Sequence, residues 1–137
     1  MEKKILLIDE NLQENKNFID VLRTAYEVDP VGYISAARIK LQHSEEYNLV
    51  VLDVMMPPLG LFDLIETEDG LKTGLVFYEH DLREKKIPVL FWSWNADFAE
   101  EIKDRAKYDS NTSFLLKDND PNHLLDGVNK FFNNLDK

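Results

Sequence analysis

Short runs of consecutive apolar residues alternate along this chain with longer segments in which apolar residues recur every three or four positions. Because each run is continuously apolar and does not alternate with polar residues, we expect strands covered on both faces, as in a parallel sheet. VGYIS is the least typical of the five runs. The runs are KILLI (4–8), VGYIS (31–35), NLVVLD (48–53), IPVLFWS (87–93) and TSFLLK (112–117).

The segments between these runs have helical periodicity. Asp120 and Pro121 precede the last of them, where Asp120 can cap a helix and Pro121 suits its first position. Five strand–helix units in this order predict an α/β fold, a doubly wound five-stranded parallel sheet flanked by five helices. The apolar positions that define the helices are Phe18, Ile19, Leu22 and Tyr26; AARIKLQ (36–42); Leu71, Leu75, Tyr78 and Leu82; ADFAEEIKDRAK (96–107); and Leu124, Leu125, Val128, Phe131, Phe132 and Leu135.

Polar residues stand where four of the predicted strands end. Asp9 and Glu10 follow the first run, and Asp53, Ser93 and Lys117 close the third, fourth and fifth. Ligands of such sheets bind outside the carboxyl ends of the strands, so these side chains are expected at one edge. An isolated aspartate at a strand end is more often structural, and the interpretation depends on the whole set.

The chemistry of this set favours a divalent cation and phosphoryl transfer. Three converging carboxylates, from Asp9, Glu10 and Asp53, would repel one another unless a cation joined them. Mg²⁺ prefers oxygen ligands and keeps several of its waters, which leaves room for a phosphoryl oxygen. Lys117 and Ser93 add a positive charge and a hydroxyl donor for the other phosphoryl oxygens.

Length and charge narrow the function further. A chain of 137 residues fits a single domain, 1–137, and the absence of cysteine excludes disulfides. A formal net charge of −10 argues against nucleic-acid binding. The sequence contains neither a secretory signal nor a membrane span, so we expect a cytoplasmic protein, monomeric or weakly homodimeric.

Four motifs together resemble the receiver domain of two-component response regulators, in the family's order and over nearly the whole chain. They are LLIDE, VVLDVMMP, IPVLFWS and FLLKD. The resemblance implies a flavodoxin-like, chemotaxis-Y-like fold with strand order 2-1-3-4-5. It also implies a Mg²⁺-dependent phosphorelay, in which a sensor histidine kinase or phosphotransfer protein supplies the phosphoryl group.

The resemblance assigns a role to each matching residue. Asp53 would be the phospho-acceptor, and Ser93 and Lys117 would bind the phosphoryl oxygens. The metal ligands would be Asp9, Glu10, Asp53 and the backbone carbonyl of Met55. Ser93 and Phe114 would form the conformational switch, which signals through a protein contact near residues 87–117 to a downstream target that the sequence does not identify.

The chain departs from the family's pattern in four places. An extended loop at about 57–70 carries acidic and apolar residues, and is either a solvated insertion or a docking flap for a partner. Trp94 replaces a small residue, and either narrows access to the acceptor or packs at the strand end. Asp118 replaces a proline and could compete for the charge of the preceding lysine, and Phe114 lacks a tyrosine hydroxyl.

The sequence therefore predicts a single-domain response regulator with no output domain, whose only expected reactions are self-phosphorylation and slow autodephosphorylation. The alternative is a degenerate receiver-fold interaction module that works without phosphorylation. A hydrolase of the haloacid-dehalogenase type is disfavoured, because its general acid would fall at Met55, which cannot transfer protons.

Overall fold

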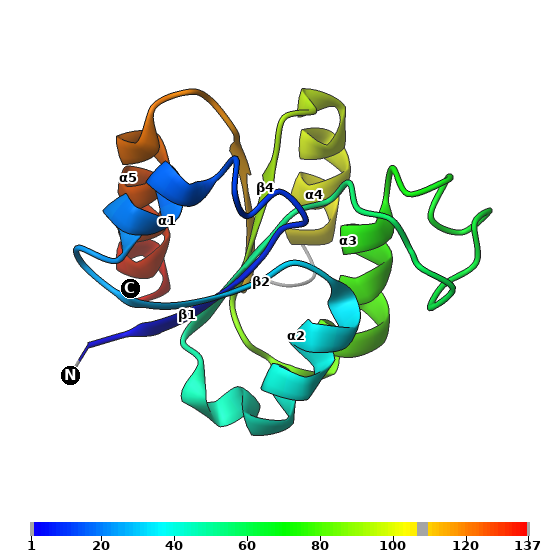
Figure 1. The fold of residues 1–137 in the computed structure, drawn as a ribbon, viewed down its shortest axis with the longest axis horizontal. Helices are drawn as coiled ribbons and strands as arrows, with labels where there is room; N and C mark the ends of the chain where they lie inside the picture. Colours follow the sequence, from blue (N-terminus) through cyan, green and yellow to red (C-terminus); the bar gives the residue numbers. More distant parts are fainter. Residues whose placement is uncertain (1, 107–109, 137) are drawn as a thin grey trace.

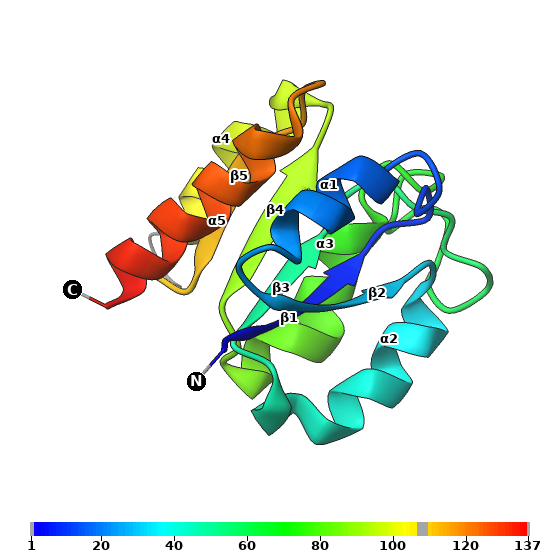
Figure 2. The same ribbon diagram turned by 60° about the vertical axis from the view of Figure 1, so that its left-hand side comes forward.

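The computed structural model describes residues 2–106 and 110–136, which form one five-stranded sheet with helices on both faces (Figures 1 and 2). All strand pairs are parallel, and the strand order is β2-β1-β3-β4-β5. The predicted fold class and strand order are confirmed. The strands are β1 (Lys4–Ile8), β2 (Glu27–Val31), β3 (Leu49–Leu52), β4 (Val89–Ser93) and β5 (Thr112–Leu116).

Five α-helices alternate with these strands, extended in places by short 3₁₀ or π segments. The α-helices are α1 (Lys16–Leu22), α2 (Ile34–Lys40), α3 (Thr73–Phe77), α4 (Ala99–Ala106) and α5 (Pro121–Leu135). The short segments are the 3₁₀ helices η1 (Leu41–Glu46), η3 (Arg83–Lys85) and η4 (Ala96–Phe98), and the π-helix η2 (Tyr78–Leu82). No helix in the described part of the chain is long and apolar enough to cross a membrane.

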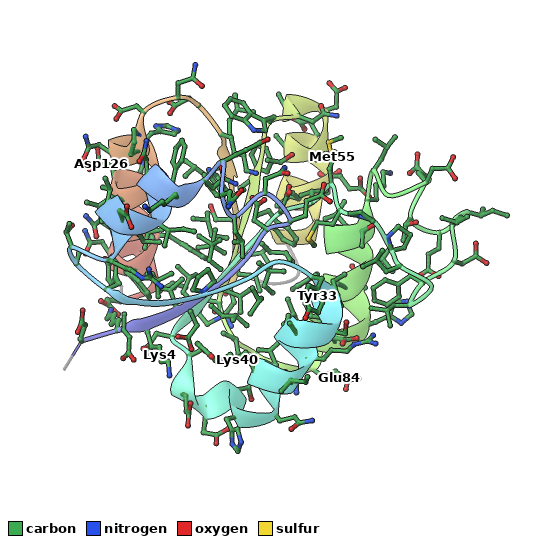
Figure 3. All side chains as sticks on the ribbon, in the orientation of Figure 1. Lys4, Tyr33, Lys40, Met55, Glu84 and Asp126 are labelled. Carbon is green, nitrogen blue, oxygen red and sulfur yellow. The ribbon has the colours of Figure 1, made fainter. Side chains whose placement is uncertain are left out.

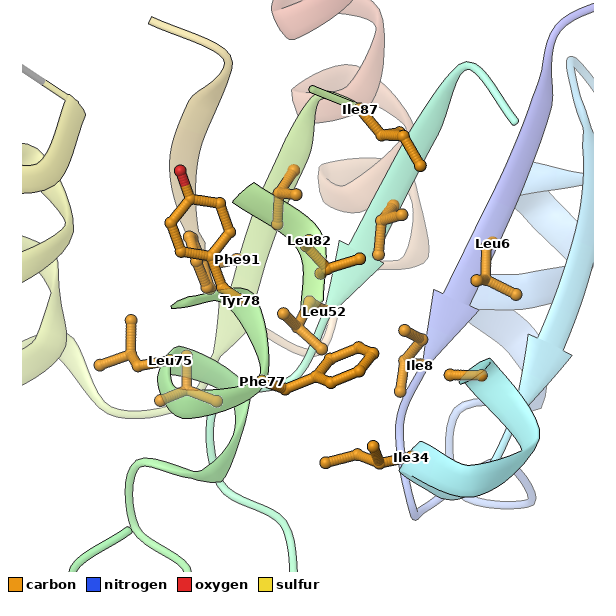
Figure 4. Close-up of a cluster of buried hydrophobic side chains, with 14 of the residues drawn as sticks. Leu6, Ile8, Ile34, Leu52, Leu75, Phe77, Tyr78, Leu82, Ile87 and Phe91 are labelled. Atoms are coloured by element: carbon orange, nitrogen blue, oxygen red, sulfur yellow. The ribbon is translucent and has the colours of Figure 1, made fainter. Parts of the chain in front are cut away.

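The two faces of the sheet are covered by different helices. Helices α1 and α5 lie on one face, and α2, α3 and α4 lie on the other (Figure 1). Ile5 and Leu7 of β1 pack toward α1 and α5, whereas Leu6 and Ile8 pack in the opposite cluster, part of which Figure 4 shows. Burial on both faces explains why these runs are continuously apolar.

The predicted second strand is wrong in position. The chain pairs with β1 over Glu27–Val31, four residues before the predicted 31–35, and Ile34 already begins α2. This strand lies at the edge of the sheet and contains the charged Asp29 and the strand-breaking Pro30, so it lacks the continuous apolar pattern of the inner strands. An edge strand tolerates proline because one side of its backbone needs no partner.

Helix boundaries differ from the predictions by a few residues. Tyr26 lies beyond the end of α1, and Leu71 is exposed before α3 begins at Thr73. The predicted capping of α5 is confirmed, because the Asp120 carboxylate accepts a hydrogen bond from the Asn122 N–H at 2.9 Å. The last residue of the predicted 96–107 helix lies outside the described residues.

Candidate functional site at the carboxyl edge of the sheet

The register of the parallel strands brings the predicted site residues to one edge. Ile8 pairs with Leu52 and Ser93 pairs with Leu116, so the residues that follow these strands emerge together. The Asp53 N–H donates to the Ile8 carbonyl at 2.9 Å, and the Lys117 N–H donates to the Ser93 carbonyl at 2.8 Å. The ladder hydrogen bonds thus continue up to the site residues themselves.

Asp9, Asp53 and Lys117 form a buried ion cluster. The Lys117 Nζ lies 2.6 Å from an Asp9 Oδ and 3.8 Å from an Asp53 Oδ, and 4.5 Å from the centroid of the Trp92 ring. Relative exposures are 0% for Asp9, 5% for Asp53 and 4% for Lys117. One ammonium therefore balances two carboxylates in a place where water screens little, which leaves an excess of negative charge.

Within this cluster, the surroundings shift the pKa of Asp53 upward by a large amount. Burial, reinforced by the nearby Asp9 carboxylate, raises the pKa of Asp53 to about 7, although Lys117 and the Met55 N–H favour the ionised form. Glu10 lies on the exposed rim, and partial burial together with Asp9 raises the pKa of its carboxyl. Protonation or an added cation would relieve the excess of negative charge at Asp53.

The chain that follows Asp53 is fixed by the start of α3. The Met55 N–H donates to an Asp53 Oδ at 3.3 Å, and the Gly74 N–H donates to the Val54 carbonyl at 2.8 Å. The buried Thr73 hydroxyl donates to the Met56 carbonyl. A Cβ on Gly74 would lie 2.2 Å from the Asp53 carbonyl oxygen, so only glycine permits this approach. Figure 3 shows Met55 where the chain leaves the sheet for this turn.

Thr73 and Gly74 were not predicted as site residues. Their signal in the sequence is weak, since a Thr-Gly pair inside a helical pattern has many explanations. Their contacts, with the backbone of Asp53, Val54 and Met56, support the turn that follows Asp53.

Ser93 and Phe114 do not join the ion cluster. The buried Ser93 hydroxyl accepts a hydrogen bond from the Asn95 N–H at 3.2 Å, and the half-buried Phe114 ring packs against the core on the α3–α4 face. Trp94 is 57% exposed, and both alternatives for it, narrowed access to Asp53 and packing at the strand end, stay predictions.

Asp118 lies away from Lys117. Its carboxylate contacts the His123 imidazole at 3.5 Å and accepts a hydrogen bond from the Asp120 N–H at 2.8 Å. The lysine ammonium contacts Asp9 and Asp53 instead. The competition for the lysine charge that the sequence suggested is therefore not seen.

The donor chemistry of the site fits Mg²⁺. Asp9 and Asp53 supply buried carboxylate oxygens, Glu10 adds a carboxylate at the exposed rim, and the half-buried Met55 has a backbone carbonyl of the same hard-oxygen type. Among the residues that the structure describes, however, no three carboxylate or imidazole side chains converge as a preassembled metal site. The Lys117 ammonium takes the place of a cation against Asp9 in this arrangement.

Solved structures with the same fold share this arrangement of strands and helices. Neither a protein-family profile nor a curated protein sequence matches the chain. The chemotaxis response regulator CheY4 of Vibrio cholerae is 20% identical, covers 96% of this chain and 99% of its own, and superposes with a TM-score of 0.67. A receiver protein from Pseudomonas putida is 23% identical, with coverages of 95% and 98% and a TM-score of 0.65.

A third solved structure agrees with these two. The CheY-like receiver domain protein of Methanospirillum hungatei is 14% identical, with coverages of 95% and 93% and a TM-score of 0.66. At such low identity the likeness concerns the fold and leaves the chemistry of individual residues to be argued separately. The chain therefore has the fold of the CheY-like receiver domains of response regulators.

Proposed function

We propose that this protein is a response regulator that accepts a phosphoryl group on Asp53. The observation that supports the proposal best is the meeting of Asp9, Asp53 and Lys117, remote in sequence, in one buried cluster at the carboxyl edge of a receiver fold. A buried carboxylate with excess negative charge around it is costly for a purely structural role, and is typical of functional sites.

The reaction is a nucleophilic substitution at phosphorus. A carboxylate oxygen of Asp53 attacks the phosphoryl group of a phosphohistidine, the P–N bond breaks, and the departing imidazole takes up a proton from water. Lys117 remains beside the new acyl phosphate and can bind one of its oxygens, and the Ser93 hydroxyl can turn from Asn95 to bind another. Asp9, Glu10, Asp53 and the Met55 carbonyl would hold Mg²⁺, which supplies positive charge for the transferring oxygens.

The output of the reaction is a change of surface. The new phosphoryl group adds nearly two negative charges to a cluster that already has an excess of them. Movement of Ser93 toward the phosphoryl group would open space beside β4, into which Phe114 could turn. The equilibrium between two arrangements of the same fold would shift, and a protein partner would bind one of them.

The partners follow from this chemistry. The donor would be a sensor histidine kinase or a phosphotransfer protein, and the target a protein that recognises the phosphorylated surface. A cytoplasmic location goes with this role.

Phosphoryl transfer can be tested without the natural donor. Incubation with acetyl phosphate and Mg²⁺ is expected to add one phosphoryl group to the intact mass of the protein. The addition should disappear in Asp53→Asn and persist in Asp20→Asn, an exposed position on α1. Equal labelling of wild type and Asp53→Asn, or no labelling of the wild type, would contradict the proposal.

A receiver fold that works without phosphorylation is the second candidate. It is favoured by the close Lys117–Asp9 pair and by the lack of three converging metal-ligand side chains in the described residues. Mg²⁺ titration followed by ¹H–¹⁵N NMR separates the two. Saturable shifts around Asp9, Asp53 and Met55 support the phosphorelay, and unchanged spectra support the second candidate.

A further inference from the structure

The extended 57–70 loop presents an apolar surface to solvent. Figure 1 shows this loop projecting from the body of the molecule beside α3. Ile65 is 88% exposed, and its neighbours along the loop are also open to solvent. We call this set the apolar loop surface; it consists of Leu59, Leu61, Leu64 and Ile65 of the loop and Leu71, which directly follows it.

The loop is held against the body of the molecule by its aromatic residue. The Phe62 ring stacks on the His80 imidazole of η2 with 5.4 Å between centroids, and the Arg38 guanidinium of α2 lies 5.3 Å from the Phe62 centroid. His80 also contacts the Glu66 carboxylate at 2.7 Å. These contacts join the loop to two different helices.

A second set of contacts fixes the end of the loop. Thr67 is fully buried, and its hydroxyl donates to the Asp63 carbonyl at 3.1 Å. The Lys72 ammonium bridges Glu68 at 2.7 Å and Glu101 of α4 at 3.2 Å. The loop therefore buries Thr67 and partly buries Phe62 on its inner side, while the apolar loop surface faces outward.

This division of the apolar residues points to binding. Polar residues on the outer side would be hydrated more favourably than exposed leucine and isoleucine, so a loop with no binding role would be expected to have polar residues there. Exposed apolar residues that gather in one segment and are flanked by polar ones, as Leu64 and Ile65 are by Asp63 and Glu66, are typical of interaction sites. Near its base, the loop borders a shallow hollow of about 320 Å³ lined mainly by Met55, Met56, Pro57, Pro58 and Leu71, with Glu10 at its edge.

The charge of the loop restricts what can bind there. Residues 57–72 contain four acidic residues and one lysine, and the whole chain has a formal charge of −10. A second copy of this chain, an anionic membrane surface or a nucleic acid would bring like charge against this rim. A protein segment with apolar side chains flanked by lysine or arginine matches both the apolar surface and the acidic rim.

We propose that the 57–70 loop is a docking surface for a basic, amphipathic segment of a protein partner. Apolar side chains of the segment pack on Leu61, Leu64 and Ile65, and its basic residues lie near Asp63 and Asp69. The surface uses none of the residues of the ion cluster. Docking at this surface is a function separate from the proposed phosphoryl transfer, and the partner segment binds whether or not Asp53 is phosphorylated.

The test uses a synthetic amphipathic peptide of leucine and lysine, titrated into the ¹⁵N-labelled full chain. We expect saturable chemical-shift changes concentrated in residues 57–72. Added salt should weaken the binding, and a matched peptide in which glutamate replaces lysine should cause no such changes. The double variant Leu64→Ser/Ile65→Ser should bind about tenfold or more weakly, a loss equivalent to about 1.4 kcal/mol or more. Ile39→Ser, which removes an exposed apolar residue of α2, should bind as the wild type does.

Two further variants keep the result interpretable. Ile65→Lys alone, at the most exposed position of the surface, should weaken peptide binding without disturbing the fold. Asp53→Asn should bind the peptide as the wild type does, because docking does not depend on the phosphorylation site. The docking proposal and the phosphoryl-transfer proposal can therefore fail independently of each other. Shifts spread over the acidic surface, undiminished binding by the double variant and Ile65→Lys, self-association through the loop, or binding to vesicles of anionic phospholipid would each overturn the proposal.

Discussion

Replacing Asp53 with asparagine should make the folded protein more stable above neutral pH. Burial and the Asp9 carboxylate raise the pKa of Asp53 from 3.8 to about 7. The folded protein therefore holds this proton more tightly than the unfolded chain does. The stability that Asp53 contributes is complete below pH 3.8, and is lost as the pH rises through about 7. Asparagine has nearly the same shape and no charge to desolvate.

The size of the effect follows from this pKa. Each pH unit between the two pKa values corresponds to about 1.4 kcal/mol, so the rise from 3.8 to about 7 is equivalent to about 4 kcal/mol. Asp9 and Asp53 share the Lys117 ammonium, and small movements within the cluster would relieve part of the electrostatic repulsion between the two carboxylates. We therefore expect Asp53→Asn to be about 2–4 kcal/mol more stable than the wild type at pH 8. Near pH 4 the two proteins should be nearly equal.

Urea unfolding without divalent cations measures the difference directly. Wild type and Asp53→Asn are compared at pH 4, 6 and 8, and Asp20→Asn serves as the matched control on an exposed helix face. The control should follow the wild type at every pH. If the gain from Asp53→Asn did not depend on pH, or if the wild type were the more stable protein at pH 8, the electrostatic account of the cluster would be refuted.

Four other substitutions test the surroundings of the site and the packing and capping of α5. Lys117→Met removes the ammonium beside Asp9 and Asp53; it should cost about 3–5 kcal/mol in urea unfolding at pH 8, because the carboxylates stay buried without a partner. Gly74→Ala should cost about 2–3 kcal/mol, because its Cβ meets fixed backbone. Gly127→Ala meets only the movable side chain of Leu115, and should cost less than about 1 kcal/mol after the gain in helix propensity. Asp120→Ala should lower the free energy of unfolding by about 1 kcal/mol, through loss of the α5 cap.

The sequence predicted the inner part of the fold because burial on two faces leaves a plain pattern. Strands β1, β3 and β4 are apolar at nearly every position, and their ends identified Asp9 and Asp53 without any knowledge of distances. The position of β2 was predicted wrongly because an edge strand is buried less completely and lacks the continuous apolar pattern. The polar Asp29 and Pro30 belong to β2, whereas the apolar Tyr33 and Ile34 that follow are the N-cap and first residue of α2.

Contacts between remote side chains lay beyond prediction for a different reason. Residue types indicated that Asp9, Asp53 and Lys117 would meet, but only side-chain geometry shows that Lys117 pairs more closely with Asp9 than with Asp53. Similarly, nothing in the loop sequence distinguishes Phe62, which packs inward against His80, from Ile65, which faces solvent. Apolar character alone does not say which side of an irregular loop is buried.

The identity of the phosphorylated residue is the most direct test of the proposed function. After incubation with acetyl phosphate and Mg²⁺, borohydride reduces an aspartyl phosphate to homoserine, and peptide sequencing by mass spectrometry locates the change. We predict homoserine at position 53 and at no other aspartate. Homoserine at Asp9 or at a surface carboxylate, or an unmodified position 53 in a protein that has taken up phosphate, would contradict the assignment.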